Sequence, residues 1–190
     1  MANNYESEVA VKALLAEKTI LFPTDTVWSV GCLPYATSAL SQMLHLKRST
    51  KAENFEVLFN SITQIKRFVP FLHPRLETLL AFHLRPLTML VDGALGLPKE
   101  LSNEEGLTAI RLVQDELSIQ LIEEVESPII SIAANPEGAP FPNGFGSIRS
   151  DFLQGVDYIM KIRQKDLLTQ AQLSVMVKLD EHENLIFLRE

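Results

Sequence analysis

Residues 22–32 read FPTDTVWSVGC, in which an apolar segment runs into Pro23 and then into Thr24-Asp25-Thr26. Two hydroxyls around a carboxylate have two explanations at the end of a buried strand. They can be turn chemistry, in which Asp25 and the threonines satisfy nearby backbone groups. They can also form the floor of a site for a small polar ligand, because ligands bind at strand ends in α/β sheets. This stretch alone does not decide between the two.

The chain has 190 residues, of which 46% are hydrophobic, and this predicts one compact domain over residues 1–190 with a large core. No apolar run is long enough for a membrane span, and the first residues lack the pattern of a secretion signal. The single Cys32 allows no intramolecular disulfide, so we expect a cytoplasmic protein.

The net charge is −7, which argues against broad binding to nucleic acid. Acidic residues crowd positions 100–126, and we interpret them as a solvated surface. Basic residues gather instead at Lys47, Arg48 and Lys51 and at Lys66 and Arg67. A local basic cleft on an acidic protein fits an anionic small ligand better than a duplex.

Apolar periodicity predicts helices and strands that alternate along the chain without a linker or repeat. Helices are expected over 4–17, 37–47, 61–68, 74–82, 115–124 and 148–153, with Thr37 or Ser38, Ser61 and Asp115 as N-caps. Strands are expected over 19–22, 55–59, 87–91, 106–112, 129–133, 156–162, 173–179 and 185–188. This alternation indicates an α/β or α+β fold around one mixed sheet.

Other polar groups also lie at predicted element ends. Lys47, Arg48 and Lys51 can grip a triphosphate, but they can equally complement the dipole of the preceding helix, and the second reading is favoured on sequence alone. Arg111 ends an apolar strand, where burial requires a carboxylate or phosphate partner. Asn135 follows the strand at 129–133 and begins a loop rich in Pro and Gly.

Other kinds of site lack their sequence signals. The four His residues and Cys32 do not have metal-ligand spacing, so no metal held by protein side chains is expected. Neither a nucleophile elbow nor a Walker-type phosphate loop is present.

In order and spacing, these stretches resemble the YrdC/YciO family over nearly the whole chain. The family opens with P-T-D/E-T-V-Y-G-L-G-C, matched here by residues 23–32, and continues with a K-x-R, matched in part by Lys47-Arg48-Ser49. A P-L-T strand, a strand ending in Arg, an S-x-S-A-N-x-S-G loop and a late Ser strand before a terminal L-R follow. Their counterparts are residues 86–88, Arg111, residues 131–138, Ser174 and Arg189.

The resemblance implies a twisted, open mixed sheet with flanking helices around a concave cleft. It implies L-threonylcarbamoyladenylate synthase activity, in which ATP with Mg²⁺, bicarbonate and L-threonine give threonylcarbamoyl-AMP and pyrophosphate for modification of tRNA by partner proteins. No covalent nucleophile is implied. The residues implied on the threonine side are Thr24, Thr26, Arg111 and Ser174. Those implied for the nucleotide and its phosphates are Lys47, Arg48, Asn135, Ser131 and Arg189.

Departures from the family pattern gather on the nucleotide side. The second cation of K-x-R is shifted to Arg48, the second Ser of the loop is Ala133, and its third is Glu137. Phe141 replaces a small Ser, and Asn54-Phe55 resembles the YciO branch rather than the synthases. A second hypothesis is therefore a non-catalytic or weakly active member that binds a nucleotide, an amino-acid-like metabolite or double-stranded or structured RNA in the same cleft.

Overall fold

The computed structural model describes residues 2–49, 54–166 and 173–190. In this part of the chain, nine strands form one mixed sheet in the order β7-β1-β2-β6-β3-β5-β4-β8-β9. The strands are β1 (Ile20–Pro23), β2 (Trp28–Cys32), β3 (Glu56–Phe59), β4 (Leu87–Val91), β5 (Thr108–Leu112), β6 (Ile129–Ala133), β7 (Tyr158–Ile159), β8 (Val175–Leu179) and β9 (Leu185–Arg189). The sheet is open, with edges at β7 and β9, and the expected α/β class is confirmed.

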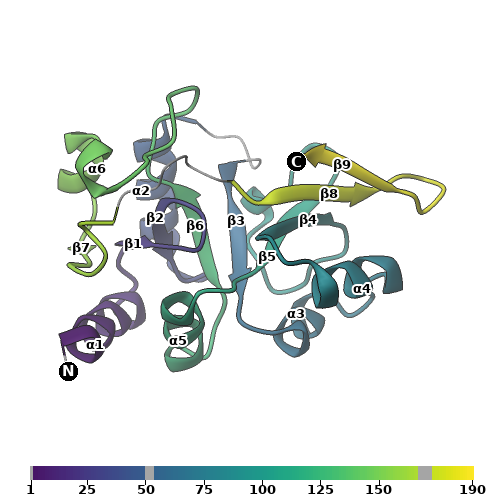
Figure 1. Ribbon diagram of the computed structural model, residues 1–190, viewed down its shortest axis with the longest axis horizontal. Helices are drawn as coiled ribbons and strands as arrows, with labels where there is room; N and C mark the ends of the chain where they lie inside the picture. The colour runs from purple at the N-terminus through teal and green to yellow at the C-terminus, as the bar shows by residue number, and fades with distance from the viewer. Residues whose placement is uncertain (1, 50–53, 167–172) are drawn as a thin grey trace.

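Six α-helices accompany the sheet in the described residues: α1 (Ala2–Leu15), α2 (Thr37–Lys47), α3 (Ile62–Phe68), α4 (Pro74–Phe82), α5 (Glu116–Glu124) and α6 (Ser150–Gln154). Figure 1 shows α1, α5 and α3 in a row along the lower side of the sheet, with α6 above it. The β8–β9 hairpin extends to the right (Figure 1). None of the described helices is long and apolar enough to cross a membrane.

The stretch FPTDTVWSVGC forms most of an antiparallel hairpin. Strands β1 and β2 pair with Ile20 opposite Gly31 and Pro23 opposite Trp28, so residues 24–27 make the connection. Thr24 Oγ1 donates to the carbonyl of Val27 at 2.8 Å and accepts from the backbone N–H of Thr26 at 3.1 Å. The threonines therefore do supply turn chemistry, although this does not exclude a role in a site.

Gly31 is required by the close packing of this hairpin. A Cβ at Gly31 would lie 2.8 Å from Phe22 Cε1 and 2.9 Å from Ile129 Cγ2. We expect Gly31→Ala to lower the free energy of unfolding by about 1–3 kcal/mol through overpacking. Denaturant unfolding of this variant is compared with Gly146→Ala, where a Cβ meets no heavy atom within 4 Å. Equal stability of the two variants would contradict the packing argument.

The helix N-termini confirm some of the predicted N-cap residues and contradict others. Ser61 accepts from the backbone N–H of Gln64 at 3.1 Å, and Asp115 accepts from that of Ser118 at 3.0 Å, which confirms both predicted N-caps. The expectation that Thr37 or Ser38 caps α2 was wrong, because the N-cap is Ala36 and no side chain caps the helix. The strand expected over 156–162 is reduced to β7, which pairs only with Ile20 and Leu21 of β1.

Candidate functional site

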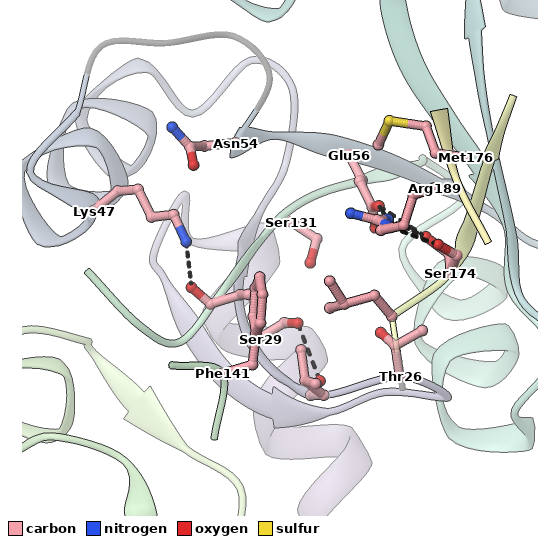
Figure 2. A pocket seen from close by; sticks show the side chains of 13 residues that line it. Thr26, Ser29, Lys47, Asn54, Glu56, Ser131, Phe141, Ser174, Met176 and Arg189 are labelled. Atoms are coloured by element: carbon pink, nitrogen blue, oxygen red, sulfur yellow. Dashed lines mark hydrogen bonds and ion pairs between the residues drawn. The ribbon is translucent and has the colours of Figure 1, made fainter. Parts of the chain in front are cut away.

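A cavity of about 90 Å³ opens where β2, β3, β6, β8 and β9 approach one another. Figure 2 shows its charged side chains spread over two sides, with Lys47 on one and Glu56 and Arg189 on the other. Hydroxyl groups lie between them, and Phe141 also lines the cavity. The polar side chains that line the cavity include Thr26, Ser29, Lys47, Glu56, Ser131, Ser174 and Arg189.

Lys47 reaches the cavity from the last turn of α2, and its side chain is buried although it is charged. Its Nζ donates to Asn135 Oδ1 at 2.9 Å and, more weakly, to the Ala133 carbonyl at 3.4 Å. Burial lowers the pKa of Lys47 to about 8, and the carboxylate of Glu137 opposes that shift. A buried ammonium with its pKa near neutrality is typical of a binding or catalytic site.

Arg189 closes the opposite side of the cavity from the end of the edge strand β9. Its Nε donates to the Ser174 carbonyl at 2.7 Å, and its Nη2 donates to Ser174 Oγ at 2.8 Å. Ser174 Oγ also lies 2.6 Å from Thr88 Oγ1. The guanidinium is thus fixed by the residue that leads into β8.

Glu56 begins β3 and places a carboxylate at the base of the cavity. Its Oε1 accepts from Thr88 Oγ1 at 2.8 Å and from Ser174 Oγ at 3.2 Å, and lies 3.6 Å from Arg189 Nη2. Its Oε2 lies 3.3 Å from Arg111 Nε. Burial raises the pKa of Glu56, but Arg111, Arg189 and the two hydroxyls outweigh this effect, so the pKa falls below its ordinary value.

Arg111 is the partner that connects the Thr24-Asp25-Thr26 turn to Glu56. Its side chain is only 1% exposed, and its Nη1 donates to Thr26 Oγ1 at 2.7 Å and lies 3.2 Å from Asp25 Oδ1. Burial raises the pKa of Asp25, and Arg111 opposes that shift. The sequence expectation of a buried Arg with a carboxylate partner is therefore confirmed, and there are two such partners.

The structure brings most of the sequence-predicted site residues together. Thr26, Lys47, Ser131, Ser174 and Arg189 line the cavity. Asn135 joins it through Lys47, whereas Thr24 and Arg111 lie one layer behind Thr26, which Thr24 contacts at 3.0 Å. Thr24, Thr26, Arg111, Ser174 and Arg189 thus belong to one polar network through Glu56, whereas Lys47 and Asn135 are hydrogen-bonded to each other on another side of the cavity.

Arg48 is the predicted residue that the structure places elsewhere. It ends α2 in the left-handed region, with φ 57°, and its Nη2 donates to Asp151 Oδ2 at 2.9 Å. Its side chain is 61% exposed. Lys51, which the sequence grouped with it, lies outside the described residues. The left-handed cap turns the chain away from the cavity, so Lys47 alone of this pair enters it.

A larger hollow of about 620 Å³ adjoins the cavity. It is lined by residues 134–136, residues 139–143, Ser147 and Arg149. Phe141 lines both spaces, and Asn135 lines the hollow while it holds Lys47. The hollow has the volume of an ordinary small-molecule site, whereas the cavity alone is much smaller. Among the described residues, no group of three or more His, Cys, Asp or Glu side chains could hold a metal ion.

Two parts of the site were not predicted from the sequence. One is Glu56, and the other is Ser29 together with β2, the second strand of the hairpin. The segment Phe55-Glu56-Val57-Leu58-Phe59 places one acidic residue at the start of an apolar strand. A charge in such a position needs a buried partner, and this signal could have paired Glu56 with Arg111. Ser29 gives no comparable signal, because its place in the site depends on β2, and that strand was not predicted.

The chain belongs to the Sua5/YciO/YrdC family, whose family model, described as "Telomere recombination", matches residues 12–190. One curated relative is the threonylcarbamoyl-AMP synthase of Escherichia coli O6:H1 strain CFT073, which is 25% identical over 158 residues, covering 80% of this chain and 83% of the relative.

Two solved structures show the same fold. P. abyssi Sua5 complexed with L-threonine has a TM-score of 0.84 and 21% identity, covering 97% of this chain and 54% of that one. E. coli YciO also has a TM-score of 0.84, with 17% identity, covering 99% and 89%. This chain therefore spans about half the length of that Sua5 chain but most of YciO.

Proposed function

We propose that this protein forms threonylcarbamoyl-AMP from ATP, bicarbonate and L-threonine. The observation that carries the proposal is the small hydroxyl-lined cavity that meets a hollow of nucleotide size at Lys47, Asn135 and Phe141. Two adjoining spaces with a buried cation between them suit a reaction that joins an amino-acid derivative to a nucleotide. Family membership and the curated synthase relative support the same activity.

In this proposal the amino acid occupies the cavity and the nucleotide occupies the hollow. Thr26, Ser131 and Ser174 offer hydroxyls to the amino acid. Arg149 lines the hollow, and it shares the carboxylate of Asp151 with Arg48. An incoming phosphate could compete with Asp151 for these two guanidinium groups, since both are more than half exposed.

The chemistry requires positioning and charge stabilisation rather than a protein nucleophile. The amine of threonine first attacks the carbon of bicarbonate, and water leaves to give the threonine carbamate. A carbamate oxygen then attacks the α-phosphorus of ATP, and pyrophosphate leaves. Lys47, at the junction of the two spaces, would stabilise the negative charge that develops on the transferring group. Mg²⁺ would arrive with the triphosphate as part of the substrate.

A second candidate is binding of a nucleotide or amino-acid-like metabolite without turnover. Specific features favour it: Arg48 points to Asp151, Ala133 offers no hydroxyl, and Glu137 acts on Lys47 electrostatically. Each missing hydrogen bond to a charged group weakens an interaction by roughly 1.5–3 kcal/mol. Structured RNA is the less favoured ligand, given the net charge of −7.

The deciding experiment is pyrophosphate release from ATP in the presence of Mg²⁺, bicarbonate and L-threonine, with the E. coli synthase measured in parallel. We expect release that stops when threonine or bicarbonate is omitted. The loss of two hydrogen bonds to charged groups should make the rate roughly two to four powers of ten lower than that of the synthase. Binding of ATP and threonine without any threonine-dependent release would instead support the second candidate.

The pKa of Lys47 predicts a pH dependence of nucleotide binding. With a pKa of about 8, Lys47 is mainly protonated below that pH and mainly neutral above it. ATP affinity should therefore fall as the pH rises through this value, by up to about tenfold per pH unit. Calorimetric titration of wild type and Lys47→Arg checks this, because arginine keeps its charge throughout. A flat wild-type profile would contradict the role of Lys47.

A further inference from the structure

We infer that the hollow recognises an adenine base, which stacks on Phe141 and forms a pair of hydrogen bonds with the amide of Asn143. The inference rests on the proposed function only in that the ligand of the hollow is taken to be a nucleotide. It goes further by naming the base, and it gives each of the two side chains a separate role in binding that base.

The lining of the hollow suits a flat, weakly polar group. Most of the lining consists of two alanines, three prolines and Phe141, and the polar side chains are few. Sites for small organic ligands have this composition, in which apolar groups supply contact area and a few polar groups set the orientation. Phe141 is the only aromatic residue among those described as lining the hollow, and it is 39% exposed. A partly exposed aromatic ring of this kind is a surface on which nucleobases stack.

The loop that carries Phe141 has little conformational freedom. Pro140 and Pro142 flank Phe141 in the sequence. Each proline has a fixed φ, and a residue that precedes proline is restricted to extended conformations. The amide of Asn135 also donates to the carbonyl of Ala139 at 2.6 Å, which holds the loop at its start. A base that stacks on Phe141 therefore loses little affinity to ordering of the loop.

Asn143 is the polar residue of the lining that remains for a base. It is exposed, and its side chain makes no hydrogen bond within the part of the chain that the structure describes. The three other polar residues of the lining, Asn135, Ser147 and Arg149, have partners in the protein at 2.6, 2.8 and 3.1 Å respectively. The amide of Asn143 can therefore bond a ligand without breaking a contact of the protein.

The amide of Asn143 predicts a preference among bases, because it has one donor group, Nδ2, and one acceptor, Oδ1. Adenine presents the matching pair on one edge, where N7 accepts from Nδ2 and the N6 amino group donates to Oδ1. Hypoxanthine carries an oxygen in place of that amino group, so two acceptors would face each other. Stacking makes no such distinction, since every base has a π-face. Phe141 should therefore supply affinity for any base, and Asn143 should supply the preference for adenine.

The test uses AMP, IMP and ribose 5-phosphate as ligands in calorimetry, because they share a sugar and a phosphate and differ in the base. Wild-type protein should bind AMP roughly tenfold more tightly than IMP. It should bind IMP roughly tenfold more tightly than ribose 5-phosphate, which has no base to stack. Asn143→Ala should bring the affinity for AMP close to that for IMP. Phe141→Ala should weaken both nucleotides by about tenfold and leave their ratio unchanged.

Two controls accompany these variants. Ribose 5-phosphate is the internal control, since neither variant should change its affinity. Phe71→Ala is the matched control for Phe141→Ala, because Phe71 is 96% exposed and lines neither the cavity nor the hollow. We expect this variant to bind all three ligands as wild type does.

The wild-type comparison stands even if a variant does not fold. Equal affinities of wild-type protein for AMP and IMP, or no binding of AMP, would overturn the inference. A folded Asn143→Ala variant that keeps the preference, or a folded Phe141→Ala variant that binds AMP as wild type does, would also overturn it. A preference for AMP without threonine-dependent pyrophosphate release would overturn only the proposed synthase activity, and release without a base preference would overturn only the present inference.

Discussion

Replacing Lys47 by alanine is expected to slow threonine-dependent pyrophosphate release by roughly two to three powers of ten. The variant removes the buried ammonium that joins the cavity to the hollow, and it leaves Asn135 Oδ1 without its 2.9 Å donor. The loss should appear in kcat as well as in KM, because the cation stabilises charge that develops during the reaction. Steady-state kinetics with ATP as the varied substrate measures both parameters.

The matched control for this variant is Lys12→Ala, at an exposed position on α1. It removes one positive charge and places alanine in a helix, where alanine is well tolerated. We expect kinetics within about twofold of wild type for this control, since surface changes away from a site have small effects. A folded Lys47→Ala protein with a wild-type kcat would contradict the assignment of Lys47 to the reaction.

Replacing Arg111 by methionine is expected to lower the free energy of unfolding by about 3–5 kcal/mol. The change removes the only guanidinium described within ion-pair distance of Asp25, and it leaves the carboxylates of Asp25 and Glu56 facing each other in a buried region. Chemical denaturation of the variant, with Arg67→Met on the exposed face of α3 as the control, measures the effect.

Charge removal provides a second test of the same network. If uncompensated carboxylates cause the instability, adding Asp25→Asn and Glu56→Gln to Arg111→Met should restore a large part of the lost free energy. If the triple variant is no more stable than the single variant, loss of packing rather than of charge balance is the cause. A single variant as stable as Arg67→Met would contradict the structural role of Arg111.

Much of the fold follows from the apolar pattern of the sequence. Strands β4 and β6 and helices α2 and α4 have the predicted bounds, because their apolar periodicity and flanking residues agree. Strand β2 was missed because all five of its residues are buried and two of them are Ser29 and Gly31. It has neither the alternation nor the composition by which strands are usually recognised. Its place in the sheet depends on pairing with β1 and β6.

The candidate site was predictable where a residue type needs a buried partner. Arg111 gave such a signal, and its partners are Asp25 and Glu56. The direction of Arg48 was not predictable, since it depends on a left-handed helix cap and on Asp151, about a hundred residues further along the chain. The meeting of Glu56 with Arg189 depends on the pairing of β8 with β4 and β9, which local sequence does not specify.

The central claim is that the cavity and the hollow hold two substrates that react with each other. The most direct measurement incubates the protein with ATP, Mg²⁺, L-threonine and ¹³C-bicarbonate and analyses the nucleotide products by mass spectrometry. The account predicts an AMP adduct that contains threonine and one ¹³C atom, formed by wild type and nearly absent with Lys47→Ala. If wild-type protein binds both ATP and threonine but yields no labelled adduct, the claim is contradicted.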